Sequence, residues 1–127
     1  MSHEERQRLD EVARSAEDAM TTALINLQTV ARDDRALRVA LAGELDCYTA
    51  EQVGPRLREL AESDCRNLVL DLCRLSFCDS AGIDLFVRLD RRCRAAGTRL
   101  LLCDVPPPVV KSIRVLGADR DLRLVVS

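Results

Sequence analysis

The chain has 127 residues, of which 47% are hydrophobic and 31% are charged, and its formal net charge is −2. This length fits one domain with its own core, and the charge balance argues against a disordered protein and against a nucleic-acid binder. Proteins are therefore the expected partners. The longest apolar runs are too short to span a bilayer, so no membrane segment is expected.

Six cysteines are spread over the chain, and the nearest pair, Cys73 and Cys78, has four residues between its members. A disulfide framework requires an exported chain, and the N-terminus has no apolar stretch for export. We therefore expect a cytoplasmic protein. A zinc site requires closer ligand pairs, and the only histidine is His3. The sequence predicts no metal and no cofactor, with cysteines buried as small apolar side chains.

The first third of the chain predicts an arm followed by a β-hairpin. Residues 1–22 mix charges with apolar residues at helical spacing, which predicts a helical or mobile N-terminal arm. Residues 24–30 and 37–41 are predicted strands, joined by a turn at residues 33–34. A domain is expected from residue 23 to the end of the chain.

A first helix is predicted after residues 43–46 leave the second strand. Thr49 and Gln52 have the spacing of a capping box, which predicts a helix start at Thr49. Proline clashes with the preceding turn of a helix, so a kink or a later start is expected at Pro55. The helix is predicted to end near Glu62.

The second half of the chain alternates short apolar runs with segments of helical period. The predicted elements are a strand over 67–72, a connection over 73–78, a helix from Ser80 to Gly97, a strand over 99–103, a helix from the prolines at 106–108 to Gly117, and a strand over 122–126. The resulting order is β-β-α-β-α-β-α-β. It predicts an α/β fold with one mixed β-sheet of about five strands packed with three to four helices.

Two acid–base pairs at helical spacing, Asp84 with Arg88 and Asp90 with Arg94, are predicted to be solvated surface pairs on the second helix. Each such pair stabilises a helix by roughly 0.2–0.5 kcal/mol. They carry no functional prediction by themselves.

Catalytic sites are excluded by the residues available. A serine or cysteine nucleophile needs a base, and His3 is the only histidine. The chain has neither a glycine-rich phosphate loop nor a dinucleotide fingerprint. A Mg²⁺ site would require convergence of at least two of Asp46, Asp71, Asp79, Asp84 and Asp104, whose expected roles are in turns and caps. We therefore predict that the chain is not an enzyme.

Residues 75–83, Leu-Ser-Phe-Cys-Asp-Ser-Ala-Gly-Ile, form the most informative segment. It resembles the phosphorylation signature of the STAS family of anti-sigma factor antagonists, in which a short apolar approach precedes Asp-Ser-Ser/Ala-Gly-Leu/Ile. Residues 43–51 resemble the family's Gly-Glu-Leu-Asp-x-x-Thr-Ala segment, 68–72 its central strand, and 109–122 its last helix and strand. The resemblance covers residues 23–127 in the right order, and it implies a single STAS domain.

The resemblance also implies a switch. Members of this family bind a kinase-type anti-sigma factor with a histidine-kinase-like ATPase fold, release the sigma factor that it holds, and are inactivated when it phosphorylates their serine. A serine phosphatase is the further expected partner. The motif makes Ser80 the acceptor, since Ala81 leaves it as the motif's only hydroxyl. The expected partner-binding residues are Asp46, Asp79, Ser80, Ala81, Gly82 and Asp84. No nucleic acid or membrane is expected, and the chain should be a monomer or weak dimer.

The sequence is compatible with other interpretations. The chain could be a STAS scaffold or sensor of a stress-signalling assembly, with residues 1–22 as the attachment element, or a STAS subunit of a lipid or anion transport system. Nucleotide binding by the domain itself is a further alternative, although no phosphate loop is visible. Ser80 could also be a plain helix N-cap, with no regulatory function.

Overall fold

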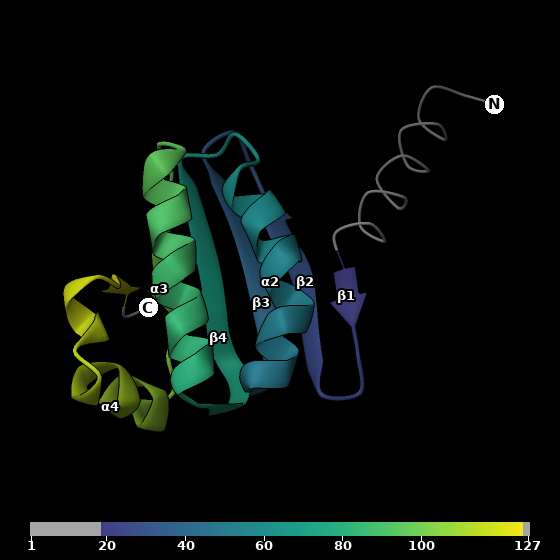
Figure 1. Cartoon of the computed structure of the whole chain (residues 1–127). Coiled ribbons are helices and arrows are strands. Elements are labelled where there is room, and N and C mark those ends of the chain that lie inside the picture. Colours follow the sequence, from purple (N-terminus) through teal and green to yellow (C-terminus); the bar gives the residue numbers. More distant parts are fainter. Residues whose placement is uncertain (1–18, 126–127) are drawn as a thin grey trace.

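One mixed β-sheet forms the body of the chain, of which the computed structural model describes residues 19–125 (Figure 1). Its strands are β1 (Ala19–Thr21), β2 (Ile25–Arg32), β3 (Ala36–Leu45), β4 (Asn67–Cys78), β5 (Arg99–Cys103) and β6 (Leu124–Val125). Its helices are α2 (Cys47–Ala61), α3 (Ser80–Ala95), α4 (Pro107–Val115) and the short 3-10 helix η1 (Ala118–Arg120). The expected α/β fold is confirmed.

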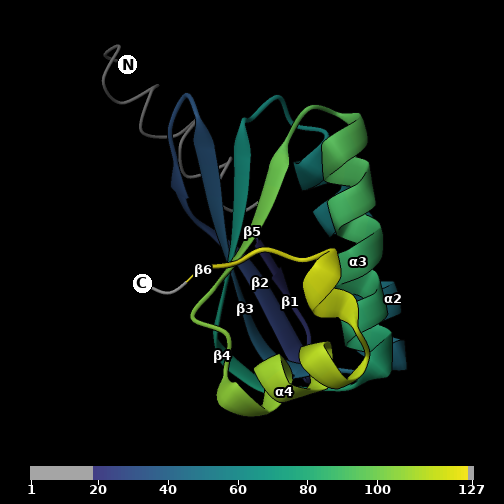
Figure 2. The ribbon, with the colours of Figure 1, turned by 90° about the vertical axis from the view of Figure 1, so that its left-hand side faces the viewer.

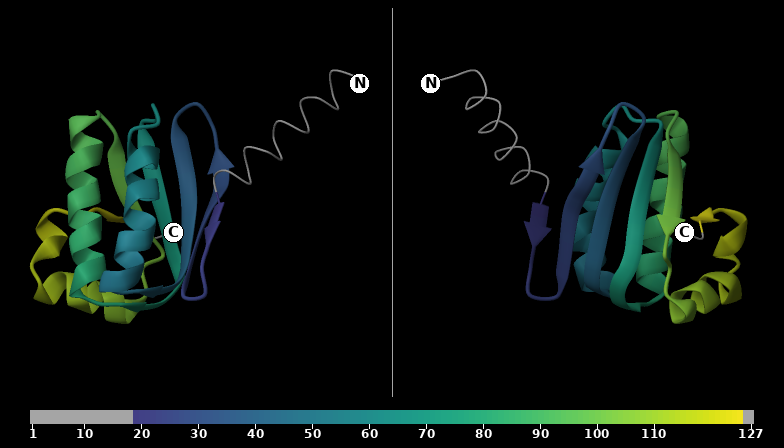
Figure 3. Two further views of the ribbon diagram at one scale, coloured as in Figure 1. Left: turned by 45° about the vertical axis from the view of Figure 1, so that its right-hand side comes forward. Right: turned by 180° about the vertical axis from the view of Figure 1, so that it is seen from behind.

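The six strands lie in the sheet in the order in which they occur in the chain. β1, β2 and β3 pair antiparallel, while β3, β4, β5 and β6 pair parallel. Parallel neighbours need crossover connections, which α2, α3 and α4 with η1 provide. Helices α2 and α3 cover the same face of the sheet, and the view from behind shows the opposite face (Figures 2 and 3).

The core lies between the sheet and these two helices. β4 buries alternate residues Leu68, Leu70 and Leu72, as expected for a strand with one face on the core. α3 buries Ile83, Phe86, Leu89 and Cys93 at helical spacing. Burying a side chain of this size contributes about 1.5–3 kcal/mol, so this layer holds α3 firmly on the sheet.

α2 begins earlier than the sequence predicts. It starts at Cys47 with Asp46 as its N-cap and continues through Pro55 to Ala61, so the predicted starts at Thr49 and Pro55 are wrong. Gly54 has no Cβ to clash with the ring of Pro55, and this removes part of the restriction on a helical residue before proline. Packing of the buried apolar face outweighs the cost of a proline inside a helix, which is about 3 kcal/mol without such relief.

β4 is longer than predicted. It runs for 12 residues to Cys78, so the connection predicted over residues 73–78 is wrong, and β3 likewise continues to Leu45. The register between these two strands shifts between Ala40 and Ala42 and again between Gly43 and Glu44. Such irregularities break the alternation of buried and exposed side chains. The second half of β4 therefore lacks the period-two pattern by which a strand is predicted from sequence.

β1 is an additional strand at the sheet's edge, where it pairs with β2. Its residues, Ala19–Thr21, fall within the predicted arm, whereas residues 1–18 lie outside the described part of the chain. Met20 packs against the core. The domain boundary at residue 23 therefore stays a prediction. β1 precedes that boundary in the chain, yet it pairs with β2 of the sheet.

The pair of Asp90 and Arg94 is not the solvated surface pair that was predicted. Asp90 is only 3% exposed, and its carboxylate accepts a 2.6 Å bond from the Arg94 guanidinium. The second predicted pair, Asp84 with Arg88, is exposed on both sides as expected. Asp90 is among the residues that α3 buries, together with Leu89 and Cys93, so the packing of the helix removes its carboxylate from the surface.

All six cysteines are free thiols. Cys93 and Cys103 are buried as predicted, whereas Cys47 and Cys73 are exposed, so the expectation of buried structural cysteines is wrong for these two. Within residues 19–125, no three potential ligands from His, Cys, Asp and Glu lie close enough to hold a metal ion. None of the helices described is long and apolar enough to cross a membrane.

Deletion of residues 1–18 tests the domain boundary. The truncated chain keeps β1 and its pairing with β2, so we expect cooperative thermal unfolding and a melting temperature within a few degrees of the full chain, equivalent to about 1 kcal/mol or less. A much larger drop would show that the deleted residues belong to the core.

Candidate partner-binding site

Two helices begin side by side at the carboxyl ends of β3 and β4, at the lower end of the molecule in Figure 1. Leu45, the last residue of β3, pairs with Cys78, the last residue of β4. Asp46 and Asp79 follow these two residues, and neighbouring strands are about 4.8 Å apart. The backbone N–H of Asp79 donates to the Leu45 carbonyl oxygen at 3.2 Å, which extends the pairing into the site.

Asp79 is the N-cap of α3. Its Oδ1 accepts the backbone N–H groups of Ala81 at 2.9 Å and of Gly82 at 3.3 Å. Ser80 is the first residue of the helix and is exposed. The alternative in which Ser80 itself caps the helix is therefore wrong. Because the Asp79 carboxylate does the capping, the Ser80 hydroxyl is not needed for helix stability.

The hydroxyl of Ser80 differs from the hydroxyls of the other serines that the structure describes. Those of Ser63, Ser76 and Ser112 donate to backbone carbonyl oxygens at 2.6 Å, 3.1 Å and 3.1 Å. Ser80 is the only described serine whose hydroxyl has no such bond within residues 19–125. It is therefore exposed and makes no hydrogen bond within the described residues.

Asp46 caps α2 in the same way that Asp79 caps α3. Its carboxylate accepts the Thr49 backbone N–H at 2.9 Å, and the Thr49 hydroxyl accepts the Asp46 N–H at 2.9 Å. The same buried hydroxyl donates to the Glu44 carbonyl at 2.8 Å. The predicted partner of Thr49, Gln52, is thus replaced by Asp46. The bond from the Thr49 N–H holds the pKa of Asp46 below its usual range, so this carboxylate is charged at neutral pH.

Gly82 allows α3 to approach the strand ends closely. A Cβ at this position would lie 2.7 Å from Cys78 Sγ and 2.9 Å from Leu45 Cγ, distances that real Cβ atoms do not tolerate. Gly82 is buried, so the structure gives it a packing function, and its contact with a partner stays a prediction. Burial and then the charge of Asp79 raise the pKa of Cys78 to about 12, which keeps this thiol protonated and unreactive beside the site.

Ser80, Asp84 and Arg88 form an exposed row along α3. They are four residues apart, and residues at that spacing are neighbours on one face of a helix. Asp84 and Arg88 are joined by a 2.9 Å ion pair. Any charge added to Ser80 would therefore lie next to the Asp84 carboxylate on the helix surface.

The structure brings the predicted site residues to one end of the fold. Asp79, Ser80, Ala81, Gly82 and Asp84 occupy the start of α3, and Asp46 occupies the neighbouring strand end. Whether they bind a partner stays a prediction.

Two aromatic residues at the same end were missed by the sequence analysis. Phe77 is 50% exposed at the end of β4, where its register partner is Glu44, and Tyr48 is 62% exposed in the first turn of α2. Exposed aromatic residues are typical of protein–protein contact sites. No pattern in the sequence separates these two rings from that of Phe86, which is fully buried.

Comparison with known proteins assigns the fold to a family. The family model described as "Mlab, STAS domain" matches residues 28–126. The chain belongs to the STAS family. Both capped helix starts lie inside the matched region, so the site is part of the STAS domain and not an addition to it.

A relative and two solved structures agree with this assignment. The anti-sigma F factor antagonist of Paenibacillus polymyxa is 33% identical over 95 residues, which are 73% of this chain and 81% of that protein. The anti-sigma factor antagonist SpoIIAA, in its unphosphorylated form, has a TM-score of 0.65 at 24% identity and covers 78% of this chain and 87% of its own. An anti-sigma factor antagonist from Mycobacterium paratuberculosis has a TM-score of 0.71 at 20% identity, with 83% and 89% covered. The two structures show that the STAS fold is shared.

Substitution of Gly82 tests the close approach of α3. We expect Gly82→Ala to lower the free energy of unfolding by about 1–3 kcal/mol, because the new methyl group forces the buried Leu45 side chain and Cys78 Sγ to shift within the packed core. This cost exceeds the roughly 0.5–1 kcal/mol that alanine gains over glycine inside a helix. Urea unfolding of the two proteins measures the difference.

The matched comparison removes one of the two contacts. In Gly82→Ala with Cys78→Ala, the Sγ atom nearest the new methyl group is absent, so the pair should cost less than the sum of the two single changes. Additive costs, or a Gly82→Ala protein as stable as the wild type, would contradict the packing account.

Proposed function

We propose that this STAS domain is an anti-sigma factor antagonist, a protein-binding switch and not an enzyme. Its unphosphorylated form binds a kinase-type anti-sigma factor and frees the sigma factor, and phosphorylation of Ser80 by that kinase inactivates it. A serine phosphatase restores the active form. The chain acts in the cytoplasm as a monomer or weak dimer. The observation that carries the proposal is the exposed Ser80 hydroxyl, which alone among the described serines has no hydrogen bond.

The names of similar proteins support the same function. The Paenibacillus polymyxa relative is an anti-sigma F factor antagonist, and a protein from Listeria monocytogenes that is 27% identical over 93 residues is an anti-sigma-B factor antagonist. The surface around Ser80 fits a protein partner, since it combines the charged caps Asp46 and Asp79 with exposed Tyr48 and Phe77. Binding through such a surface buries the aromatic rings while the caps keep the helix ends fixed.

The charge of a phosphate explains how the switch would work. A phosphoserine carries a charge of about −1.5 to −2. At Ser80 it would lie beside the carboxylates of Asp79 and Asp84, and like charges about 4 Å apart repel by about 1 kcal/mol in water and about 4 kcal/mol at an effective dielectric constant of 20. The repulsion is therefore small in the free domain and large when a partner covers the site. The positive end of the α3 dipole also favours an anion at this position, so the fold itself should tolerate it.

Phosphate mapping tests the acceptor. Incubation with the cognate kinase and ATP should add one phosphate, and fragment mass spectrometry should place it on Ser80, because that hydroxyl is exposed and unbonded. Ser80→Ala should take up none. Phosphate on Ser76 or Ser112, whose hydroxyls are bonded to the backbone, would overturn the assignment.

Calorimetric titration against the kinase tests the mechanism. Ser80→Asp adds one negative charge at the covered site and should weaken kinase binding at least about tenfold, or about 1.4 kcal/mol. Thermal unfolding of the variant should stay near wild type. Ser80→Ala should bind as the wild type does.

A control with the same charge separates a local from a general effect. Ser63 is exposed beyond the last turn of α2, at the other end of that helix from the site, so Ser63→Asp should leave the affinity within about twofold of wild type. Equal affinity of Ser80→Asp and wild type would count against electrostatic exclusion and favour a conformational switch instead.

A further inference from the structure

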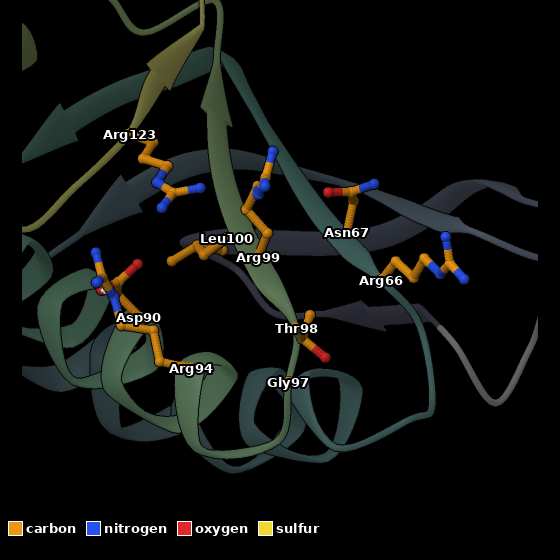
Figure 4. A pocket seen from close by; sticks show the side chains of 9 residues that line it. All are labelled: Arg66, Asn67, Asp90, Arg94, Gly97, Thr98, Arg99, Leu100 and Arg123. Atoms are coloured by element: carbon orange, nitrogen blue, oxygen red, sulfur yellow. Dashed lines mark hydrogen bonds and ion pairs between the residues drawn. The ribbon is translucent and has the colours of Figure 1, made fainter.

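A hollow of about 490 Å³ lies at the other end of α3 from Ser80. Its lining includes Arg66 just before β4, Asn67 at the start of β4, Asp90 and Arg94 on α3, Arg99 at the start of β5, and Arg123 before β6 (Figure 4). Ser80 and Arg94 are 14 residues apart on one helix, which places them about 21 Å apart along its axis. The hollow is thus separate from the proposed phosphorylation site.

The lining of this hollow is strongly positive. Four arginines and one aspartate contribute to it, whereas the whole chain carries a net charge of −2. Arginines spread evenly over an acidic protein would not gather in this way. Bringing several guanidinium groups together is unfavourable by Coulomb's law unless a counter-charge lies between them.

Among the residues that the structure describes, the one carboxylate that lines the hollow is already paired. Buried Asp90 binds Arg94 at 2.6 Å, and Arg94 also donates to the Asp121 carbonyl oxygen at 3.2 Å. Over the described range, residues 19–125, the guanidinium groups of Arg66, Arg99 and Arg123 have no carboxylate partner. Asp90 therefore fixes one arginine in place and leaves three positive charges without compensation.

The strand arrangement keeps the hollow open. β6 pairs with β5 only at Leu102 and Cys103, so no strand covers the edge of β5 at Arg99 and Leu100. Figure 4 shows Arg123 extending toward the centre of this opening, beside Leu100, with Asp90 and Arg94 on the same side. Arg66 points away from them on the opposite side. Arg99 and Arg123, which have no carboxylate partner within residues 19–125, are thus the two arginines that lie beside this opening, while Arg94 is held against Asp90.

We propose that this hollow binds a small anion that carries phosphate groups. Guanidinium groups have a planar fork of donors that matches phosphate oxygens and forms two hydrogen bonds at once, which favours phosphate over a simple halide. A group with two or more negative charges would compensate the unpaired arginines. Inorganic phosphate, pyrophosphate and the phosphate chain of a nucleotide share this chemistry, and no glycine-rich loop is needed because side chains supply the donors.

Titration of the full chain with inorganic pyrophosphate tests the proposal. Calorimetry at low ionic strength should show saturable binding of one pyrophosphate per chain. Arg123→Gln and Arg99→Gln should each weaken it about tenfold or more, since each removes a charged fork that faces the ligand. Arg114→Gln on α4 removes the same charge from an exposed site outside the hollow and should change the affinity less than about twofold. Circular dichroism confirms that the variants are folded.

Two further titrations identify the source of the phosphate. ATP that binds as tightly as pyrophosphate, with the same loss in Arg123→Gln, would show that the phosphate chain alone is recognised. ATP that binds at least tenfold more tightly would show that the base contributes, and the ligand class would then be a nucleotide. Absence of saturable pyrophosphate binding, or an equal loss in Arg114→Gln, would overturn the proposal. None of these outcomes tests the phosphorylation of Ser80, so the two proposals can fail independently.

Discussion

Parallel pairing of β3 with β4 is the constraint on which the rest of the site depends. It places Leu45 beside Cys78, and the bond from the Asp79 N–H to the Leu45 carbonyl continues it to the first turn of α3. The absence of a Cβ at Gly82 lets that turn settle against both strand ends. Two helix starts with their capping carboxylates consequently face the same side of the molecule, although they are more than 30 residues apart in the chain.

Two neighbouring residues at this helix start have different functions: Asp79 stabilises the helix, and Ser80 is the proposed phosphorylation site. Asp79 caps α3, a function that contributes about 1 kcal/mol in typical helices. Ser80 is left exposed at the first helical position. A group attached to it changes the surface and leaves the cap in place. The fold can therefore be the same in both states of the proposed switch, and the difference between them lies in what a partner meets. The arginine-lined hollow at the far end of α3 is independent of this arrangement.

Much of this could be predicted from the sequence. The order of strands and helices after β1, the hairpin turn and the segment around Ser80 follow from local patterns and from the resemblance at residues 75–83. Partners fixed by long-range pairing could not be predicted. Asp79 rather than Ser80 caps α3, Thr49 bonds to Asp46 rather than Gln52, and Asp90 is buried. In each case the spacing along the chain fits the predicted arrangement as well as the observed one. The register of β3 on β4, or the packing of α3, decides which of the two forms.

The central claim is that unphosphorylated Ser80 permits displacement of a sigma factor and that phosphorylated Ser80 prevents it. Its most direct test is a reconstituted complex of the kinase-type anti-sigma factor with its sigma factor, separated by gel filtration after addition of either form of this chain. The account predicts that the unphosphorylated chain releases free sigma factor in proportion to the amount added, and that the chain phosphorylated on Ser80 releases none. Equal release by both forms, or no release by either, would contradict it.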